Sequence, residues 1–184
     1  MTALYVFLAV LALAALWLVV TYNALVRSRN KVDEAWSGID VQLKRRHDLV
    51  PNLVSTVKGY AAHERETLEA VTDARSAAVA AHDPESVGHA EAKLTTALGA
   101  INALAEAYPE LRAADNFRSL QAELAAIEDE IQASRRIYNS NVEHFNTRTQ
   151  SFPALLVAGT MQFRPRAFFA LESPAERAVP QVAF

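Results

Sequence analysis

The feature that most constrains this chain is an uninterrupted apolar run near its amino-terminal end. All 18 residues from Ala3 to Val20 are apolar, and the first charged side chain is Arg27. A helix of this length can cross the roughly 30 Å of hydrocarbon in a lipid bilayer. We therefore predict a transmembrane helix, with residues 1–26 as the membrane anchor.

A cleaved signal peptide is the alternative interpretation of the same run, with Ala12-Leu13-Ala14 as its cleavage site. A signal peptide usually has basic residues before a shorter apolar stretch, whereas here Arg27, Arg29 and Lys31 follow the run. By the positive-inside bias, these juxtamembrane residues predict a single-pass protein whose body lies in the cytoplasm. Each contributes about 1 kcal/mol near an anionic leaflet, so the three together attract the membrane only modestly. We therefore expect them to set topology rather than to recognise a particular lipid.

The composition of the remaining chain is that of a helical protein. Alanine is abundant, whereas the 184 residues include 5 glycines, 7 prolines and no cysteine. This composition favours helix over sheet, and the lack of thiols excludes disulfides, cysteine zinc sites and cysteine nucleophiles. A net charge of −3 without a basic stripe gives no reason to expect nucleic acid as a partner.

Apolar residues in steps of three and four predict a long first helix after the anchor. The pattern continues from Val32 to Val71, with Arg46 and Glu64 filling gaps in it. We expect this helix to end near Ala81. Pro51 lies inside the pattern without shifting its register, which favours a tolerated kink over a loop.

Two further long helices follow in the sequence. Asp83 as N-cap and Pro84 at the first helical position predict the start of the second helix. Its glycines weaken it, unless Gly99 permits close approach of a neighbouring backbone. The third helix is expected from about Asp115 to Pro153, and a short fourth helix over residues 154–161.

These elements predict an all-α protein. We expect an N-terminal transmembrane helix, then an antiparallel bundle of three long helices plus a short fourth, and an extended C-terminal tail. The expected divisions are the anchor at residues 1–26, the helical bundle at 27–153, and the short helix and apolar tail at 154–184.

Short motifs are spread along nearly the whole chain. They are Tyr22-Asn23, Arg29-Asn30, Glu34-Ala35-Trp36-Ser37, Ile39-Asp40-Val41-Gln42-Leu43-Lys44-Arg45-Arg46, Asp48-Leu49-Val50-Pro51-Asn52-Leu53-Val54, Val57-Lys58-Gly59-Tyr60-Ala61, His63-Glu64, Tyr108-Pro109, Asn116-Phe117, Leu120-Gln121, Arg135, Tyr138-Asn139, Phe145-Asn146, Phe152-Pro153 and Val179-Pro180-Gln181-Val182-Ala183-Phe184. Together they resemble the bacterial LemA family. The resemblance implies a single-pass bacterial membrane protein with a long-helix bundle, and it implies no reaction. A relative associated with magnetosome membranes suggests a role in membrane organisation.

The densest basic run is a candidate partner surface. It consists of Lys44, Arg45, Arg46 and His47, flanked by Asp40 and Asp48, and could bind anionic lipid or an acidic partner. The alternative is a solvated helix face on which Asp40 pairs with Lys44 four residues later.

The apolar C-terminal tail is a candidate assembly element. It carries Phe168, Phe169, Val179, Val182 and Phe184, which are too many large apolar groups to leave in water. The tail could pack on its own bundle, enter the bilayer surface or contact a neighbouring subunit. We hypothesise that it contributes to assembly.

Trp36 lies on the first helix and is expected in the core. Asn30, Asp40 and Asn52 are candidates for buried hydrogen bonds that set helix register. We identify no catalytic, cofactor-binding or metal-binding residues, because the chain lacks a histidine pair with zinc spacing, a glycine-rich phosphate loop and a nucleophile elbow. The acidic run at residues 128–130 is interpreted as a solvated face.

We therefore predict a membrane-anchored, non-catalytic helical scaffold or protein-interaction module of the bacterial cell envelope, in the plasma membrane. The alternative is a self-assembling, membrane-organising or membrane-remodelling protein whose function is the oligomer itself. An uncharacterised hydrolase is a third, disfavoured class. The expected partners are the membrane, further copies of the chain and an unidentified protein, with no nucleic acid, small-molecule substrate or cofactor.

Overall fold

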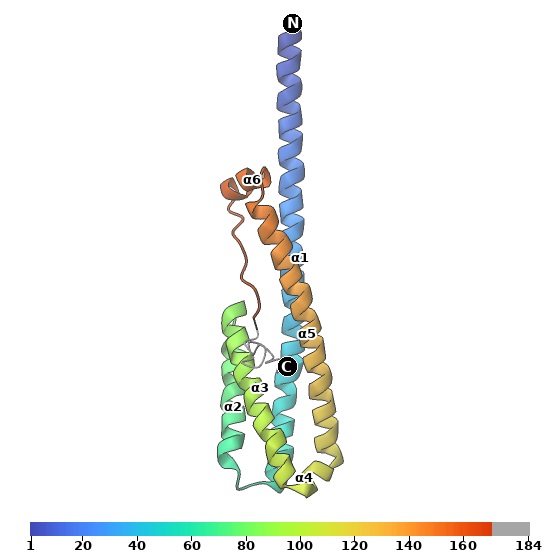
Figure 1. Ribbon diagram of the computed structural model, residues 1–184, viewed down its shortest axis with the longest axis vertical. Helices are drawn as coiled ribbons and strands as arrows, with labels where there is room; N and C mark the ends of the chain where they lie inside the picture. Colours follow the sequence, from blue (N-terminus) through green and yellow to red (C-terminus); the bar gives the residue numbers. More distant parts are fainter. Residues whose placement is uncertain (171–184) are drawn as a thin grey trace, which may run out of the picture. The chain divides into compact units, whose positions relative to one another are not determined.

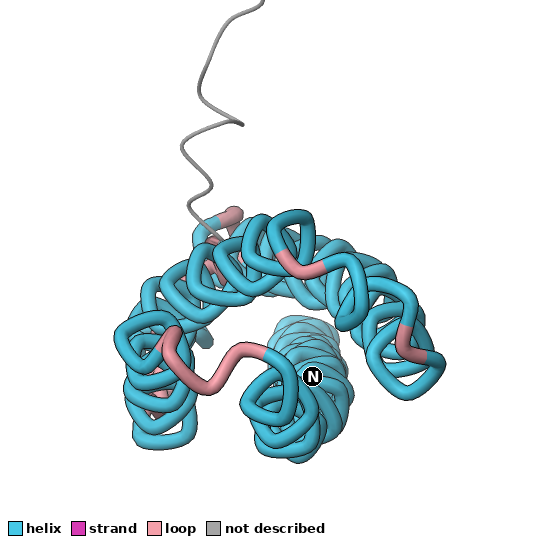
Figure 2. Tube along the Cα trace, turned by 90° about the horizontal axis from the view of Figure 1, so that it is seen from below, coloured by secondary structure: helices cyan, strands magenta, loops and turns pink. Residues whose placement is uncertain are grey.

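The computed structural model describes residues 1–170, and this part of the chain is helical, without strands (Figure 1). Short loops join most of its helices (Figure 2). The all-α prediction is confirmed. The helices are α1 (Thr2–Tyr60), α2 (Arg65–Ala80), α3 (Pro84–Ala107), α4 (Pro109–Ala113), α5 (Asp115–Gln150) and α6 (Ala154–Thr160).

Helix α1 contains the apolar run. It is long and apolar enough to cross a membrane, the only such helix among residues 1–170, and none of its most apolar window is buried in the structure. Its backbone continues as one helix from Thr2 to Tyr60, past the end of the run and past Pro51. The prediction that the helix continues across Pro51, without a loop, is therefore confirmed.

The first helix ends earlier than the sequence pattern indicates, at Tyr60 instead of near Ala81. The chain turns over residues 61–64, and α2 then forms a second helix. Val57 and Val71, on opposite sides of this turn, are both fully buried in the same core. A regular apolar spacing arises from either one helix or two that share a core, so it did not reveal the turn.

Glu64, which fills a gap in the pattern, accepts a hydrogen bond from the Tyr108 hydroxyl at 2.9 Å, and this contact raises the pKa of Tyr108.

Helix α3 begins as predicted. Asp83 caps it by accepting hydrogen bonds from the backbone N–H groups of Glu85 and Ser86. The close backbone approach occurs at Gly88 and not at Gly99. A Cβ at Gly88 would clash with the Ala170 carbonyl oxygen, whereas nothing lies within 4 Å of one at Gly99. Helices α5 and α6 agree with the predicted third and fourth helices.

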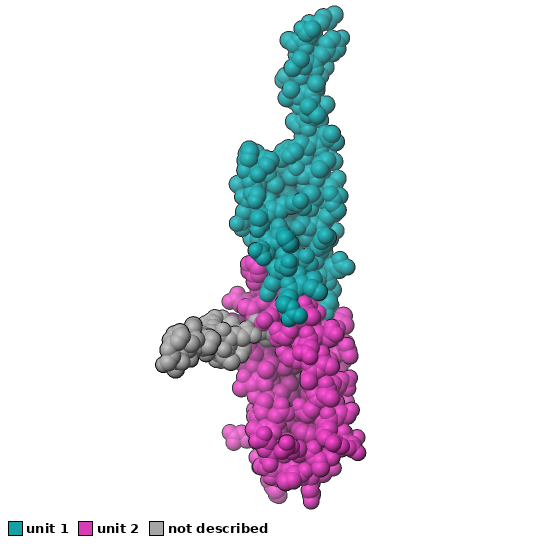
Figure 3. Space-filling model, turned by 45° about the vertical axis from the view of Figure 1, so that its right-hand side comes forward, with its two compact units in different colours: residues 1–38, 136–167 teal, residues 39–135, 168–184 magenta. Residues whose placement is uncertain are grey.

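The chain forms two compact units (Figure 3). Unit 1 consists of Met1–Gly38 and Arg136–Ala167, and unit 2 consists of Ile39–Arg135 and, among the described residues, 168–170. Helices α1 and α5 contribute residues to both units. The division into residues 1–26, 27–153 and 154–184 follows the chain and stays a prediction.

In unit 1, α5 lies antiparallel to α1. Asn141 Nδ2 donates to the Lys31 carbonyl at 3.2 Å, and Arg148 Nη1 donates to the Ala24 carbonyl at 3.4 Å. As the number on α5 increases, its partner on α1 decreases. The buried residues that hold this pair together are Leu25, Val32, Tyr138, Val142 and Phe145.

Beyond α6 the chain of unit 1 reverses direction. Gln162 takes the left-handed conformation, with φ 56°, and the N–H of Phe163 donates to the carbonyl of Ala158. This is the Schellman arrangement that ends many helices, here without its usual glycine. It places the buried Phe163 ring edge-on to both Tyr22 and Phe145.

Unit 2 contains the larger core. It lies among α2, α3, α4 and the parts of α1 and α5 that belong to this unit. Its most deeply buried members are Val50, Leu53, Val57, Val71, Leu94, Ile101 and Leu111.

Candidate functional site

A buried charged cluster joins α1 to α3 inside unit 2. Arg46 Nη1 donates to Glu91 Oε2 at 2.9 Å, and His47 Nε2 lies 2.6 Å from Glu91 Oε1. Glu91 is fully buried, and Arg46 and His47 are almost so. Both carboxylate oxygens of Glu91 are therefore occupied by residues of α1.

Two more side chains complete the environment of Arg46. Arg46 Nη2 donates to Thr95 Oγ1 at 2.8 Å, and Glu128 Oε2 lies 3.3 Å from Arg46 Nη1 without hydrogen-bond geometry. Glu128 is thus half-buried and faces a cation, which corrects its interpretation as part of a solvated acidic face. The cluster links α1, α3 and α5 through charge pairing, and this arrangement supports a structural role.

Pro51 explains another polar contact of this unit. A helix residue normally donates its N–H to the carbonyl four residues earlier, which for position 51 is that of His47, but proline has no N–H. Arg75 of α2 donates its Nε to the His47 carbonyl at 2.7 Å. The half-buried arginine thereby replaces the bond that proline removes.

The structure divides the candidate partner surface. Lys44 and Arg45 are exposed, whereas Arg46 is 4% exposed and belongs to the buried cluster, so its assignment to a surface was wrong. Lys44 pairs with Asp48 at 2.6 Å instead of with Asp40 as expected. This hydrogen bond holds the pKa of Asp48 below its ordinary value, while partial desolvation raises the pKa of Asp40.

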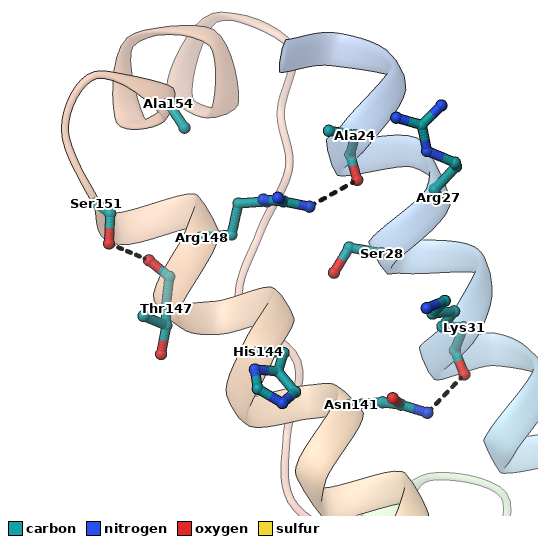
Figure 4. Close-up of a pocket in the computed structure, with 10 residues that line it drawn as sticks. All are labelled: Ala24, Arg27, Ser28, Lys31, Asn141, His144, Thr147, Arg148, Ser151 and Ala154. Atoms are coloured by element: carbon teal, nitrogen blue, oxygen red, sulfur yellow. Dashed lines mark hydrogen bonds between the residues drawn. The ribbon is translucent and has the colours of Figure 1, made fainter. Parts of the chain in front are cut away.

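The three juxtamembrane basic residues are exposed on α1 in unit 1. Arg27 and Lys31 line a cavity of about 600 Å³ together with His144 and Arg148 of α5 (Figure 4). Its remaining lining residues are small or neutral polar groups, namely Ala24, Ser28, Asn141, Thr147, Ser151 and Ala154. Arg29 lies elsewhere, with its guanidinium 5.5 Å from the centre of the Phe163 ring.

The sequence interpretation did not single out three ionisable residues, Glu91 of the buried cluster and His144 and Arg148 of the cavity, although each carried a signal. Glu91 lies between Val87 and Leu94 at the four-and-three spacing of buried positions, where a carboxylate needs a buried partner. His144 and Arg148 are four residues apart, as are Arg27 and Lys31. Each pair therefore shares a helix face, and the antiparallel packing of α1 and α5 brings the two faces together.

Trp36 is half-buried, and its ring lies 5.2 Å from that of Tyr138, whose hydroxyl donates to the Ala167 carbonyl. Burial raises the pKa of Tyr138.

Asn30, Asp40 and Asn52 are all exposed, so the hypothesis that they set register through buried hydrogen bonds was wrong. Among residues 1–170 no group of three or more His, Asp or Glu side chains is placed to hold a metal ion.

The two described residues of the candidate assembly tail differ. Phe169 is fully buried, and its ring lies 3.7 Å from the Cβ position of Gly88, so it packs on its own chain. Phe168 is 50% exposed. Val179, Val182 and Phe184 lie outside the described residues, and the assembly role of the tail stays a prediction.

The LemA family model matches residues 35–184 of this sequence. The chain belongs to the LemA family. The resemblance drawn from the sequence motifs is thereby confirmed. The matched range includes the buried cluster of unit 2, whereas the α1 residues that line the cavity precede it.

The chain is also similar to individual proteins, one of them named LemA. The chain is 31% identical over 149 residues to Protein LemA of Metamycoplasma hominis, a match covering 80% of this chain and 68% of the relative. It is 26% identical to the magnetosome protein MamQ of Magnetospirillum gryphiswaldense, over 86% of this chain and 67% of the relative. MamQ 2 of Paramagnetospirillum magneticum matches to the same extent. This LemA-family member is thus a helical protein whose N-terminal helix is long and apolar enough to cross a membrane.

Proposed function

We propose that this protein is a membrane-anchored, non-catalytic scaffold of the bacterial cell envelope that holds a protein partner beside the plasma membrane. The observation that carries the proposal is the continuity of α1. One helix contains the apolar anchor, contributes to both units and presents exposed charged residues in unit 2. A partner bound to that surface would be connected to the membrane through α1 itself.

The proposed docking surface is the exposed face of α1 in unit 2. Val41, Lys44, Arg45 and Asp48 lie within two helical turns of one another and are all exposed, Val41 by 57%. Arg46 and His47 point inward from the same segment. An exposed apolar side chain surrounded by charges of both signs is suited to bind a protein whose surface carries the complementary pattern of charges.

Site-specific photocrosslinking in native membranes tests the scaffold. A photoreactive amino acid at Arg45 should capture a protein of discrete mass. The same group at Glu69, an exposed position of α2, serves as the control. A missing adduct at Arg45, or an identical set of adducts at both positions, contradicts the docking surface.

The alternative function is self-assembly into a membrane-organising oligomer. Its support is the likeness to the magnetosome protein MamQ. An Arg45 adduct with twice the mass of this chain would favour this alternative over the scaffold.

Removal of residues 174–184, followed by mass measurement in detergent, tests whether the tail contributes to assembly. An unchanged mass with the helical content retained would contradict that contribution.

The cytoplasmic placement of the body rests on Arg27, Arg29 and Lys31, which follow the anchor. Protease added to spheroplasts should therefore leave the chain beyond Lys31 intact, and detergent should make it cleavable. Digestion of the helical body in intact spheroplasts would reverse the proposed topology.

A further inference from the structure

The cavity between α1 and α5 of unit 1 carries positive charge that nothing within it balances. Arg27, Lys31, His144 and Arg148 line it, and none of its ten lining residues is acidic. Arg148 donates to a neutral carbonyl, that of Ala24 (Figure 4). A half-open basic cavity of about 600 Å³ has the size of a small-ligand site and the charge to attract an anion.

The position of the cavity along α1 determines which anion it meets. The apolar run ends at Val20, and Ala24 at the edge of the cavity is four residues further along the helix, about 6 Å. The polar headgroup layer of a bilayer extends roughly 5–8 Å beyond the hydrocarbon on each side. The Ala24 edge of the cavity therefore lies at the depth of lipid phosphates.

A second, independent feature lies at the same end of unit 1. Helix α5 continues past Arg148 towards the level of the apolar run, and α6 lies across its end beside α1 (Figure 1). The large apolar residues around α6 are exposed, namely Phe152 by 81%, Leu155 by 48%, Leu156 by 60% and Met161 by 48%. Four exposed large apolar residues within one short segment, beside a helix apolar enough to span a membrane, have the pattern of an interfacial membrane contact.

We infer that this end of unit 1 is a binding site for an anionic phospholipid. The lipid phosphate lies in the cavity, where Arg27, Lys31 and Arg148 supply charge and Ser28 and Thr147 supply hydroxyl donors. The exposed residues of α6 enter the acyl chains of the same leaflet. The protein thus holds a particular lipid beside its anchor, which the three juxtamembrane charges of α1 alone would not achieve.

The apolar residues of α6 distinguish a lipid from a free phosphate ion. A site for a soluble anion needs the basic cavity alone and gains nothing from exposed leucines beside it. A lipid uses both features, because its headgroup and its acyl chains are joined. The two ligand sources therefore predict different effects when α6 is changed.

Native mass spectrometry of the full chain in detergent tests the headgroup contact, with phosphatidylglycerol and phosphatidylcholine as competing probes. The wild type should retain phosphatidylglycerol preferentially. Combining Arg27→Gln, Lys31→Gln and Arg148→Gln should reduce that preference at least tenfold, because each basic group near an anionic headgroup contributes roughly fivefold (about 1 kcal/mol). The control combines Lys58→Gln, Lys93→Gln and Arg112→Gln, which removes the same charge from exposed positions of unit 2.

Each outcome of this competition decides the proposal. An unchanged preference in the cavity variant, or an equal loss in the control, overturns it. Inorganic phosphate that displaces the lipid at equal concentration assigns the cavity to a free anion and also overturns it. Combining Leu155→Ser with Leu156→Ser should weaken retention of phosphatidylglycerol while the cavity stays intact, and unchanged retention contradicts the role of α6.

A depth measurement gives an answer that does not depend on charge variants. The chain has no cysteine, so Leu156→Cys accepts a single spin label in vesicles of equal parts phosphatidylcholine and phosphatidylglycerol. Ile137→Cys is the matched control, since both residues are 60% exposed and belong to unit 1. The label at position 156 should be accessible to oxygen and shielded from a water-soluble nickel chelate, with the reverse at position 137. Equal accessibility to the chelate at both positions overturns the inference, whatever the crosslinking of the docking surface shows.

Discussion

Two groups of basic residues, one in each unit of this protein, lie in opposite environments. In unit 2, Arg46 lies in the interior and is paired with Glu91 and Glu128, and Arg75 donates to a backbone carbonyl. In unit 1, Arg27, Lys31 and Arg148 line an open cavity whose lining residues include no carboxylate. A buried charge must be paired for the chain to fold, whereas an exposed charge costs little and stays available to a ligand. The closed cluster therefore serves stability, and the open cavity serves binding.

The strongest test of this comparison is the removal of Glu91. Glu91→Ala leaves Arg46 buried without its closest carboxylate, and the free energy of unfolding should fall by about 3–5 kcal/mol. Urea unfolding of the full chain in detergent, followed by circular dichroism, measures the change.

A combined replacement separates the cost of an unpaired buried charge from the loss of packing. Arg46→Met, Glu91→Leu and Glu128→Gln together remove the cation and both carboxylates that face it and keep side-chain volume, so most of the lost stability should return. A combined variant as unstable as Glu91→Ala would show that the unpaired charge of Arg46 is not the cause of the loss. A loss below about 1 kcal/mol in Glu91→Ala would contradict the closed-cluster interpretation altogether.

Close packing in unit 2 gives the next effect in size. Gly88→Ala places a Cβ against the Ala170 carbonyl, and overpacking of this kind typically costs about 1–3 kcal/mol. Gly99→Ala is the matched change in the same helix with open space around it, and it should stabilise by up to about 1 kcal/mol. Opposite shifts of the unfolding midpoint are the expected result. Shifts of the same sign would mean that the contact with Ala170 does not constrain α3.

Much of the fold, and less of the site, followed from the sequence. The apolar run, the Asp83 cap and the ends of α5 and α6 are local features, in which a few neighbouring residues determine the backbone. The turn at residues 61–64 was missed because both of its arms bury residues at the same spacing. The cavity was missed because two basic pairs more than a hundred residues apart meet only once the helices pack. Sequence spacing gives the face of a helix, but not what lies opposite that face.

The contact between Arg75 and the His47 carbonyl predicts a coupling with Pro51. Arg75→Met should destabilise the protein, because it leaves a carbonyl in the interior without a donor. In a Pro51→Ala background the restored backbone N–H can bond to the same carbonyl, so the loss should be smaller by about 1 kcal/mol. A double-mutant cycle on unfolding free energies measures this difference. Strict additivity would show that Arg75 does not replace the bond removed by proline.

The smallest expected effect on stability lies in the open cavity. Combining Arg27→Gln, Lys31→Gln and Arg148→Gln removes three exposed charges of one sign, so the free energy of unfolding should stay within about 0.5 kcal/mol of the wild type. Any change should be an increase in the free energy of unfolding, because these charges repel one another across the cavity. Salt screens such repulsion, so added sodium chloride should narrow the gap between the variant and the wild type. Thermal unfolding at low and high salt measures both effects. A loss comparable to that of Glu91→Ala would mean that the basic residues of unit 1 hold the fold together, and the distinction between the closed cluster and the open cavity would fail.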